Sequence, residues 1–454
     1  MLKPLLISST KKSSGKTILS IGLSKIANDL KYNIQTFKKG PDFIDPSWLS
    51  YASSNPCYNL DFNTMSSSEI AKMYREKSKN SNLNIIEGTK GLYDGVSITG
   101  DDSNEQLALL LKAEILLIID CEGMTRGIAP LLNGYKSFNR KLNINRVVLN
   151  NVSTPRHEIK LLSAIKEYTD FNVIGCIPKI KDFIVERHLG LIPTFQHAQK
   201  RKVLSSITTI IKRSINYKSL LPKITKAKES RNVISKRVNK SSYTIGVAVD
   251  SAFGFYYPDD LEKIEKYGCK IKRVNLIKDK QITSLDALFI GGGFPETQAR
   301  DLEKNKSMKK SIKDAIENGM PTYAECGGLM YLAKTIKFNN SKMKMCGVFD
   351  IDIVMHDKPV GRGYTKLIMN NHPWGIDLEK INAHEFHYSS VRFNNKRYKY
   401  AYNIKRGYGI NGKSDGLIYK NTIASFSHLR STEQFNWVKN FINFIKENNG
   451  KTNI

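Results

Sequence analysis

The sequence predicts two α/β domains joined by a basic linker, from its length and from the order of its apolar segments. At 454 residues, 40% of them apolar, the chain exceeds what one hydrophobic core usually organises. Short apolar runs alternate with longer amphipathic stretches, which is the pattern of βαβ units with parallel strands. We expect a parallel-sheet domain at 1–200, a linker at 201–242 and a second α/β domain at 243–440.

The strands of the first domain are predicted from apolar runs that are too short to be buried helices. These runs lie at 5–7, 83–86, 115–119, 147–149 and 173–177. A polar loop follows the first run, and an apolar-periodic segment after that loop predicts a helix through Leu30. The repeated order of strand and helix favours a parallel sheet.

The linker is predicted from its charge. Residues 201–240 hold twelve Lys or Arg and one acid, Glu229, with no sustained apolar stripe after Ile211. A solvated tether is the simpler interpretation, and a docking surface for an anionic substrate is the alternative. The second domain then shows its own alternation, with strands predicted at 243–249, 287–290 and 322–324 and helices at 258–267 and 304–318.

The composition limits the classes of function. Lys and Arg number 71 against 42 Asp and Glu, a net charge of +29 that would attract polyanions. A codon bias explains most of this Lys excess, and no nucleic-acid-binding motif accompanies it, so we expect no nucleic-acid partner. The six separated cysteines have no zinc-type spacing, and no apolar run reaches the roughly 20 residues of a membrane span. We expect a cytoplasmic protein with reduced thiols and no membrane association.

A phosphate-binding loop is predicted at 8–17, between the first strand and the first helix. In such a loop backbone N–H groups cradle phosphates, a Lys neutralises the β and γ oxygens, and the next hydroxyl binds Mg²⁺. Gly15, Lys16 and Thr17 fit these roles, whereas Thr10 stands where the motif has its first Gly. The triplet alone is weak evidence, and its place between a strand and a helix strengthens it.

Carboxylates that could bind Mg²⁺ come from two segments. Asp42 and Asp45 lie in a Pro-bounded loop at 39–46, and Glu87 ends a buried strand. Mg²⁺ prefers carboxylate, phosphate and water oxygens, and ligands gather at the carboxyl edge of a parallel sheet. Asp42 and Asp45 could instead cap a turn or a helix. Packing explains a charged group at a buried strand end poorly, so Glu87 is the stronger candidate.

A nucleophilic thiol is predicted at Cys326, where a strand meets a small-residue turn and a helix within 321–330. A helix N-terminus lowers the pKa of a thiol, and glycines let backbone N–H groups approach an oxyanion. The glycine-rich segment 291–296 could supply further donors, and His428, near the end of a predicted strand, is the candidate base. A buried structural cysteine is the alternative. The segment 383–388 is one residue short of a zinc-protease motif, so we interpret it as non-metal. It could face the substrate or a domain interface, or it could be purely structural.

Together these motifs resemble one family, the cobyrinic acid a,c-diamide synthases, which are ATP-dependent glutamine amidotransferases of corrinoid biosynthesis. The similar stretches keep the family's order over nearly the whole chain. They are 37–46, 87–95, 153–158, 186–191, 252–257, 292–296, 324–330 and 384–389. Any one of them is weak to moderate evidence, and their order and spacing are strong evidence.

The resemblance implies a P-loop domain of the dethiobiotin-synthetase type followed by a class I glutamine amidotransferase domain. It implies ATP and Mg²⁺ as cofactors, and glutamine and cobyrinic acid, an acidic tetrapyrrole, as substrates. The a and c carboxylates would be activated as acyl phosphates, which ammonia from glutamine displaces. The magnesium ligands would be Thr17, Asp45 and Glu87, with Asp42 and Asp94 near the reacting carboxylate.

In the second domain the resemblance implies that Cys326 forms a glutamyl thioester and that His428 is its base and acid. Two departures accompany the Thr10 substitution. Lys90 stands where the family often has an apolar residue, and Arg430 stands where many class I glutaminases have an acid. The group that orients His428 is therefore left open.

Three alternatives remain at this point. Related enzymes amidate sirohydrochlorin or nickel-sirohydrochlorin, and cobyric acid synthase amidates other side chains of the corrinoid. A partition-type ATPase switch with a non-catalytic glutaminase-like domain is the non-enzymatic alternative, because Lys11 occupies the place of the second lysine of such switches. The oligomeric state is open, with a homodimer among the options.

Overall fold

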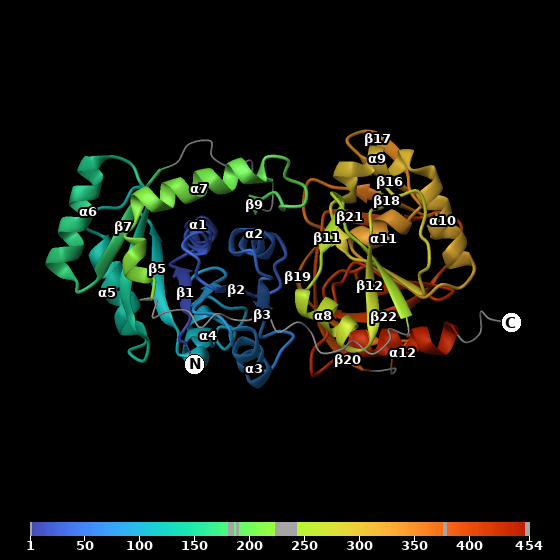
Figure 1. Cartoon of the computed structure of the whole chain (residues 1–454), viewed down its shortest axis with the longest axis horizontal. Coiled ribbons are helices and arrows are strands. Elements are labelled where there is room, and N and C mark those ends of the chain that lie inside the picture. The colour runs from blue at the N-terminus through green and yellow to red at the C-terminus, as the bar shows by residue number, and fades with distance from the viewer. Residues whose placement is uncertain (1, 180–185, 188–189, 223–242, 376–378, 450–454) are drawn as a thin grey trace. The chain divides into compact units, whose positions relative to one another are not determined.

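The computed structural model describes residues 2–179, 186–187, 190–222, 243–375 and 379–449 (Figure 1). The chain divides into two compact units, Met1–Val233 and Ile234–Ile454, and each has its own hydrophobic cores. Within those described ranges, no helix combines the length and the apolar character that crossing a bilayer requires.

A seven-stranded parallel sheet forms the centre of the N-terminal unit, in the order β3-β2-β4-β1-β5-β6-β7. All five predicted apolar runs lie in this sheet. The strands are β1 (Leu5–Ser9), β2 (Ile34–Lys39), β3 (Tyr58–Leu60), β4 (Leu83–Glu87), β5 (Glu114–Asp120), β6 (Ile144–Val152) and β7 (Asn172–Pro178), with a separate pair β8 (Glu186–Arg187) and β9 (Gly190–Leu191).

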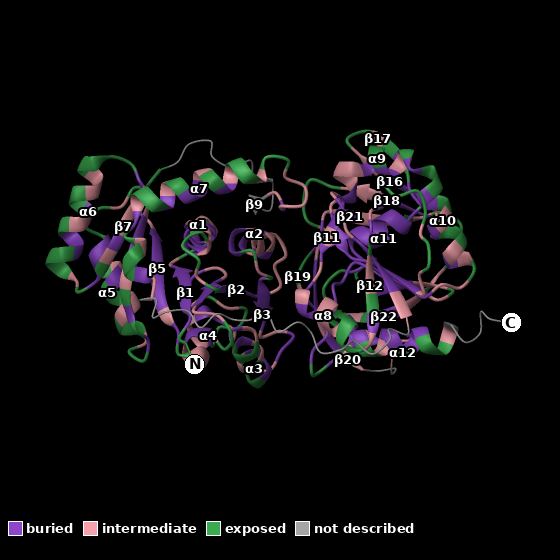
Figure 2. Cartoon of the chain, viewed as in Figure 1, coloured by how far each residue is buried: buried purple, intermediate pink, exposed green. Residues whose placement is uncertain are grey.

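Helices cover both faces of this sheet, so its strands are buried between two apolar layers (Figure 2). Three helices pack on one face, namely α1 (Lys16–Asp29), α2 (Ile44–Ser53) and α7 (Lys200–Ser214). Four pack on the other, namely α3 (Ser67–Lys77), α4 (Asn104–Leu111), α5 (Ile128–Phe138) and α6 (Pro155–Tyr168). A single turn of 3₁₀ helix, η1 (Tyr217–Leu220), follows α7.

Helix α7 corrects the predicted start of the linker at residue 201. Leu204, Ile207 and Ile211 are buried at helical spacing, and a Cβ placed on Gly22 of α1 would come within 2.4 Å of the Ile211 side chain. Basic residues occupy the exposed side of α7, so the charge of this segment belongs to an amphipathic helix of the N-terminal unit. The rest of the predicted linker, 223–242, lies outside the described residues.

The C-terminal unit is built on a nine-stranded mixed sheet in the order β12-β10-β13-β15-β24-β23-β22-β19-β20. Its first five strands are parallel and the remaining pairings are antiparallel. The strands are β10 (Tyr243–Ala248), β12 (Cys269–Val274), β13 (Ala287–Ile290), β15 (Thr322–Glu325), β19 (Gly361–Met369), β20 (Lys380–His387), β22 (Lys399–Arg406), β23 (Ser414–Tyr419) and β24 (Thr422–Ser425).

Smaller elements complete this unit. A four-stranded sheet has the order β17-β16-β18-β21, and β11 pairs with β14. Their bounds are β11 (Phe253–Phe255), β14 (Gly292–Gly293), β16 (Thr335–Phe338), β17 (Ser341–Lys344), β18 (Ile351–Met355) and β21 (Ser389–Phe393). The helices are α8 (Pro258–Lys266), η2 (Pro295–Gln298), α9 (Ala299–Lys304), α10 (Lys306–Glu317), α11 (Gly327–Leu332) and α12 (Trp437–Asn449).

Candidate active site

The loop between β1 and α1 has the geometry of a phosphate-binding loop. Gly15 has φ 97°, a left-handed conformation that favours glycine, and a Cβ there would lie 2.5 Å from Nδ2 of Asn150. Helix α1 starts at Lys16 with neither a capping side chain nor an acidic residue in its first turn. Its first N–H groups therefore remain available for an anion. Thr10 does not have a positive φ, so this loop does not require glycine there.

Lys16 is held inside this loop rather than in solvent. Its Nζ donates to Oγ of Ser9 over 2.7 Å, and the residue is buried. Burial, reinforced by the nearby Lys38 ammonium, lowers the pKa of Lys16 to about 8. A desolvated cation at the start of a helix is suited to neutralising phosphate oxygens.

The predicted magnesium ligands meet at the carboxyl end of β4. Oγ1 of Thr17 donates to Oε1 of Glu87 over 2.7 Å and lies 3.4 Å from Oδ2 of Asp45. A residue that the sequence did not single out, Lys38 at the end of β2, lies between the two acids. Its Nζ is 2.6 Å from Oδ2 of Asp45 and 2.8 Å from Oε1 of Glu87. The structure thus brings together the three predicted ligands and adds a lysine.

Glu87 is the most unusual group of this cluster. Its side chain is fully buried, and burial together with the neighbouring Asp45 charge raises the pKa of Glu87 to about 8. Its Oε2 has no hydrogen-bond partner within the described part of the chain. An orphaned buried carboxylate oxygen beside a hydroxyl and a second acid fits Mg²⁺, which takes one or two carboxylates plus phosphate and water. No three His, Cys, Asp or Glu residues of the described ranges form a complete metal cage.

Asp42 and Asp94 lie at the border of this cluster. Oδ1 of Asp42 accepts from the backbone N–H groups of Ile44 and Asp45 at the start of α2, so Asp42 does cap this helix. Its Oδ2 is also 3.7 Å from Nζ of Lys38. Asp94 is exposed, accepts from the backbone N–H of Gly91, and lies near enough for its charge to act on Lys16.

In the C-terminal unit, Cys326 lies on a sharp turn between β15 and α11. Its backbone has φ 47° and ψ −99°, which is strained for a residue with a side chain. Its N–H donates to the carbonyl of Ser425 over 2.6 Å, and this bond fixes the turn against β24. A thiol at a strained strand-to-helix turn is typical of a nucleophile.

His428 follows β24 and reaches the same turn. Burial alone would lower the pKa of His428, but hydrogen bonds to Cys326 and Glu325 outweigh it and raise this pKa to about 10. A Cβ on Gly292 would lie 2.5 Å from Cε1 of His428, so only glycine fits where this backbone passes the ring. The structure therefore pairs the predicted thiol with the predicted histidine, beside the predicted glycine-rich segment.

Comparisons with known proteins find a matching family for each of the two units of the chain. Residues 5–192 match the family described as CobQ/CobB/MinD/ParA nucleotide binding domain, and residues 244–435 match the CobB/CobQ-like glutamine amidotransferase domain. Cobyrinate a,c-diamide synthase of Magnetococcus marinus is 35% identical, covering 98% of this chain and 97% of that protein. The protein of the same name from Methanobrevibacter smithii is 35% identical, covering 93% and 95%, and that from Archaeoglobus fulgidus is 33% identical, covering 96% of both. This chain belongs to the cobyrinate a,c-diamide synthase family.

In this member of the synthase family, the segment 383–388 is largely buried. The ring of His384 stacks on that of His428 at 4.9 Å, and that of His387 stacks on Phe426 at 3.9 Å. Nδ1 of His387 also contacts the carbonyl of Ser389 over 2.8 Å. Burial is the main cause that lowers the pKa of His384 well below its usual range, and the charges of His428 and Arg430 add to the effect. His384 is thus a neutral ring that supports His428.

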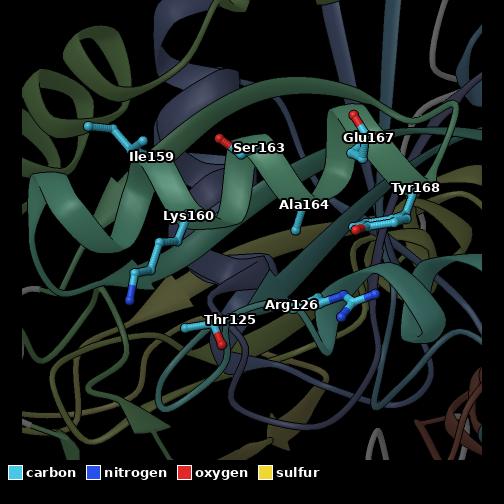
Figure 3. Close-up of a pocket in the computed structure, with 8 residues that line it drawn as sticks. All are labelled: Thr125, Arg126, Ile159, Lys160, Ser163, Ala164, Glu167 and Tyr168. Carbon is cyan, nitrogen blue, oxygen red and sulfur yellow. The ribbon is translucent and has the colours of Figure 1, made fainter.

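A surface hollow of about 450 Å³ lies beside α6 (Figure 3). Residues of α6 and the turn at Thr125 and Arg126 line it, and the Arg126 guanidinium lies 4.8 Å from the centre of the Tyr168 ring. None of the predicted site residues lines this hollow. It therefore adds no candidate to the synthase site.

Proposed function

We propose that this protein is an ATP-dependent synthase that amidates the a and c carboxylates of cobyrinic acid with ammonia from glutamine, in cobalamin biosynthesis. The observation that carries the proposal is that one chain holds two complementary sites. The cluster of Lys16, Thr17, Asp45 and Glu87 suits phosphoryl transfer, and the buried pair of Cys326 and His428 suits glutamine hydrolysis. The names of the relatives support the tetrapyrrole substrate.

Glutamine hydrolysis follows from the state of Cys326 and His428. Because its contacts with Cys326 and Glu325 raise the pKa of His428 to about 10, this imidazole is a strong enough base to take a proton during the reaction. The sulfur attacks the side-chain amide carbon, a C–S bond forms, and the C–N bond breaks as His428 protonates the leaving ammonia. Water then cleaves the thioester to give glutamate and the free thiol.

Amide formation requires a leaving group, because a carboxylate does not condense with ammonia in water. A carboxylate oxygen of the tetrapyrrole attacks the γ-phosphorus of ATP, which gives an acyl phosphate and ADP. Ammonia then attacks the acyl carbon, the C–O bond to the phosphoryl group breaks, and the proton that the nitrogen loses goes to the leaving phosphate. Lys16 is placed to neutralise charge on the transferred phosphoryl group, and Asp42 and Asp94 lie at the border of that cluster.

Magnesium is proposed as the cofactor, held by Thr17, Asp45 and Glu87. The orphaned Oε2 of Glu87 and the hydroxyl of Thr17 supply the oxygen donors that Mg²⁺ prefers. When bound, Mg²⁺ would polarise the phosphate oxygens of the nucleotide. The protein's own contribution is the buried carboxyl end of β4, where Lys38 keeps the two acids together.

The partition-type ATPase alternative depends on Lys11 and on a non-catalytic second unit. In the structure Nζ of Lys11 is 2.8 Å from Oδ2 of Asp120 in the same chain. The strained Cys326 paired with His428 is also poorly explained without glutaminase activity. Neither observation favours a switch.

One assay tests the proposed function. The protein is incubated with ATP, Mg²⁺ and glutamine, and cobyrinic acid, sirohydrochlorin and nickel-sirohydrochlorin are offered separately. Mass spectrometry should show a doubly amidated product from cobyrinic acid. Amidation of a sirohydrochlorin alone would assign the other tetrapyrrole, and no amide from any of the three would refute the proposal.

A further inference from the structure

The position two residues after His428 cannot supply the carboxylate that orients it. This position is Arg430, whose Nη2 lies 3.3 Å from Oδ2 of Asp259 in a buried ion pair. Asp259 is thus paired with Arg430. Arg430 itself carries only hydrogen-bond donors, so it cannot accept a hydrogen bond from the imidazole N–H of His428.

A buried carboxylate reaches His428 from the strand that also carries the nucleophile. Oε2 of Glu325, the last residue of β15, is 3.2 Å from Nδ1 of His428. Both side chains are at most 4% exposed, so water does not compete for this contact. Because Glu325 directly precedes Cys326, one strand end presents both the thiol and the carboxylate.

The other oxygen of Glu325 is anchored by two donors. Oε1 accepts from the hydroxyl of Tyr323 over 2.6 Å and from the backbone N–H of Leu429 over 2.9 Å. The Tyr323 ring is itself fixed, since it stacks on Phe289 at 5.4 Å. These two hydrogen bonds to Oε1 fix the orientation of the carboxylate, so that its other oxygen, Oε2, points toward His428.

We propose that Glu325 is the positioning residue of the glutaminase site, the third member beside Cys326 and His428. Its carboxylate keeps the proton on Nδ1, so that Nε2 of the same ring is left for the thiol. When the thiol proton passes to His428, the carboxylate stabilises the resulting imidazolium and takes up no proton itself. The inference rests on the proposed glutaminase half of the function, and it does not depend on the tetrapyrrole.

The test compares Glu325→Gln with Glu317→Gln, the same change at a surface acid of the same unit whose partners are Tyr419 and Lys420. In Glu325→Gln the kcat of glutamine hydrolysis should fall by about 10²- to 10⁴-fold while KM changes little. The rate of synthesis from free ammonia should stay unchanged in both variants. This rate serves as a control that each variant is folded.

A second readout needs neither ATP nor tetrapyrrole. The rate of Cys326 alkylation by iodoacetamide is measured against pH, in a background whose other cysteines are replaced by Ser or Ala. The pH at which the alkylation rate is half-maximal should be higher in Glu325→Gln than in wild type, because the imidazolium that takes the thiol proton has lost its carboxylate partner. A merely structural role of Glu325 would not move this profile.

Glu325→Asp keeps the carboxylate on a shorter side chain and should restore part of the glutaminase rate and of the alkylation profile. Glutaminase and alkylation in Glu325→Gln that match wild type would overturn the proposal. So would a loss of glutaminase with an unshifted alkylation profile and no rescue by Asp. If the tetrapyrrole assignment fails, wild type makes no amide, yet the difference in alkylation between wild type and Glu325→Gln persists.

Discussion

Nζ of Lys38 lies 2.8 Å from Oε1 of Glu87, the oxygen that also accepts from Thr17. The ammonium therefore occupies the place between Glu87 and Asp45 where a divalent cation would draw on the same carboxylates. Burial by itself would lower the pKa of Lys38, but the charges of Asp45 and Glu87 outweigh it and raise this pKa well above its usual range. Lys38 is thus an internal counter-ion for two buried acids.

Lys38→Met should make the nucleotide-free protein less stable and its affinity for Mg²⁺ higher. Removing one partner of a buried ion pair costs about 3–5 kcal/mol, because the acids are left uncompensated, and an added divalent cation can neutralise them. We expect the melting temperature of Lys38→Met to rise with Mg²⁺ much more than that of wild type. Differential scanning fluorimetry at pH 8.5, where the carboxylates are ionised, measures this difference.

The matched control for this change is Lys25→Met, which removes a lysine that pairs with Asp29 on the outer side of α1. Surface pairs of this kind contribute at most about 1 kcal/mol, so this variant should show the wild-type response to Mg²⁺. Weaker Mg²⁺ binding in Lys38→Met than in wild type would show that Lys38 does not compete for the carboxylates.

Lys16→Ala should stop amide formation from glutamine and from free ammonia alike. Positive groups on a transferring phosphoryl group contribute about 10³-fold or more to its rate, and Lys16 is the cation that the P-loop holds at the start of α1. Glutamine hydrolysis in the other unit should persist. Product mass with each nitrogen source measures the effect, and amide made from ammonia at the wild-type rate would contradict the P-loop assignment.

Cys326→Ala should separate the two activities in the opposite way. Without the thiol no thioester forms, so glutamine-dependent synthesis should fall by about 10⁴-fold or more. Synthesis from ammonium salts should continue, because phosphoryl transfer uses residues of the N-terminal unit. Parallel assays with the two nitrogen sources check this. Loss of both activities in a variant with a wild-type melting curve would mean that Cys326 has a role outside glutamine hydrolysis.

The sequence pointed to those parts of the candidate site that are contiguous in the chain. Gly15, Lys16 and Thr17 share one loop, and Cys326 lies in one strand-turn-helix, so local patterns were sufficient to find them. Lys38 was missed because it has an identical neighbour, Lys39, and alternation along β2 decides which lysine meets Glu87. No local pattern shows whether Lys38 or Lys39 meets Glu87, because the answer depends on how β2 pairs with β4.

Long-range pairing explains the remaining differences in the fold. The parallel strands were found because both faces are buried and their apolar runs are continuous. Strands β19, β20 and β22 carry many polar residues and pair in antiparallel order, so no apolar run marks them. Helix α7 was predicted to be linker because the charge of 201–240 as a whole, twelve Lys or Arg and one acid, conceals the three buried apolar positions within 200–214.

Gly292→Ala should impair glutamine hydrolysis chiefly by displacing the ring of His428. The new Cβ would lie 2.5 Å from Cε1 of His428, closer than non-bonded carbon atoms allow, so the ring must move. A displacement of about 1 Å in a catalytic group can cost about 10²-fold in rate, and we expect a loss of this size in glutaminase kcat. Gly134→Ala tests a glycine of α5 that has open space around it and no positive φ, and it should leave kcat unchanged. If both substitutions lowered the glutaminase kcat equally, a clash with the His428 ring would not explain the loss.

The raised pKa of His428 predicts a pH dependence of stability that can be compared in wild type and His428→Gln. The pKa is raised from 6.5 to about 10 in the folded chain, so the folded state binds the proton more tightly than the unfolded state. The stabilisation is then complete below pH 6.5 and is lost as the pH rises through 10. The melting temperature of His428→Gln should therefore fall furthest below that of wild type near pH 6, and the gap should narrow steadily toward pH 10. A gap that is constant across this range would mean that His428 is neutral in the folded protein.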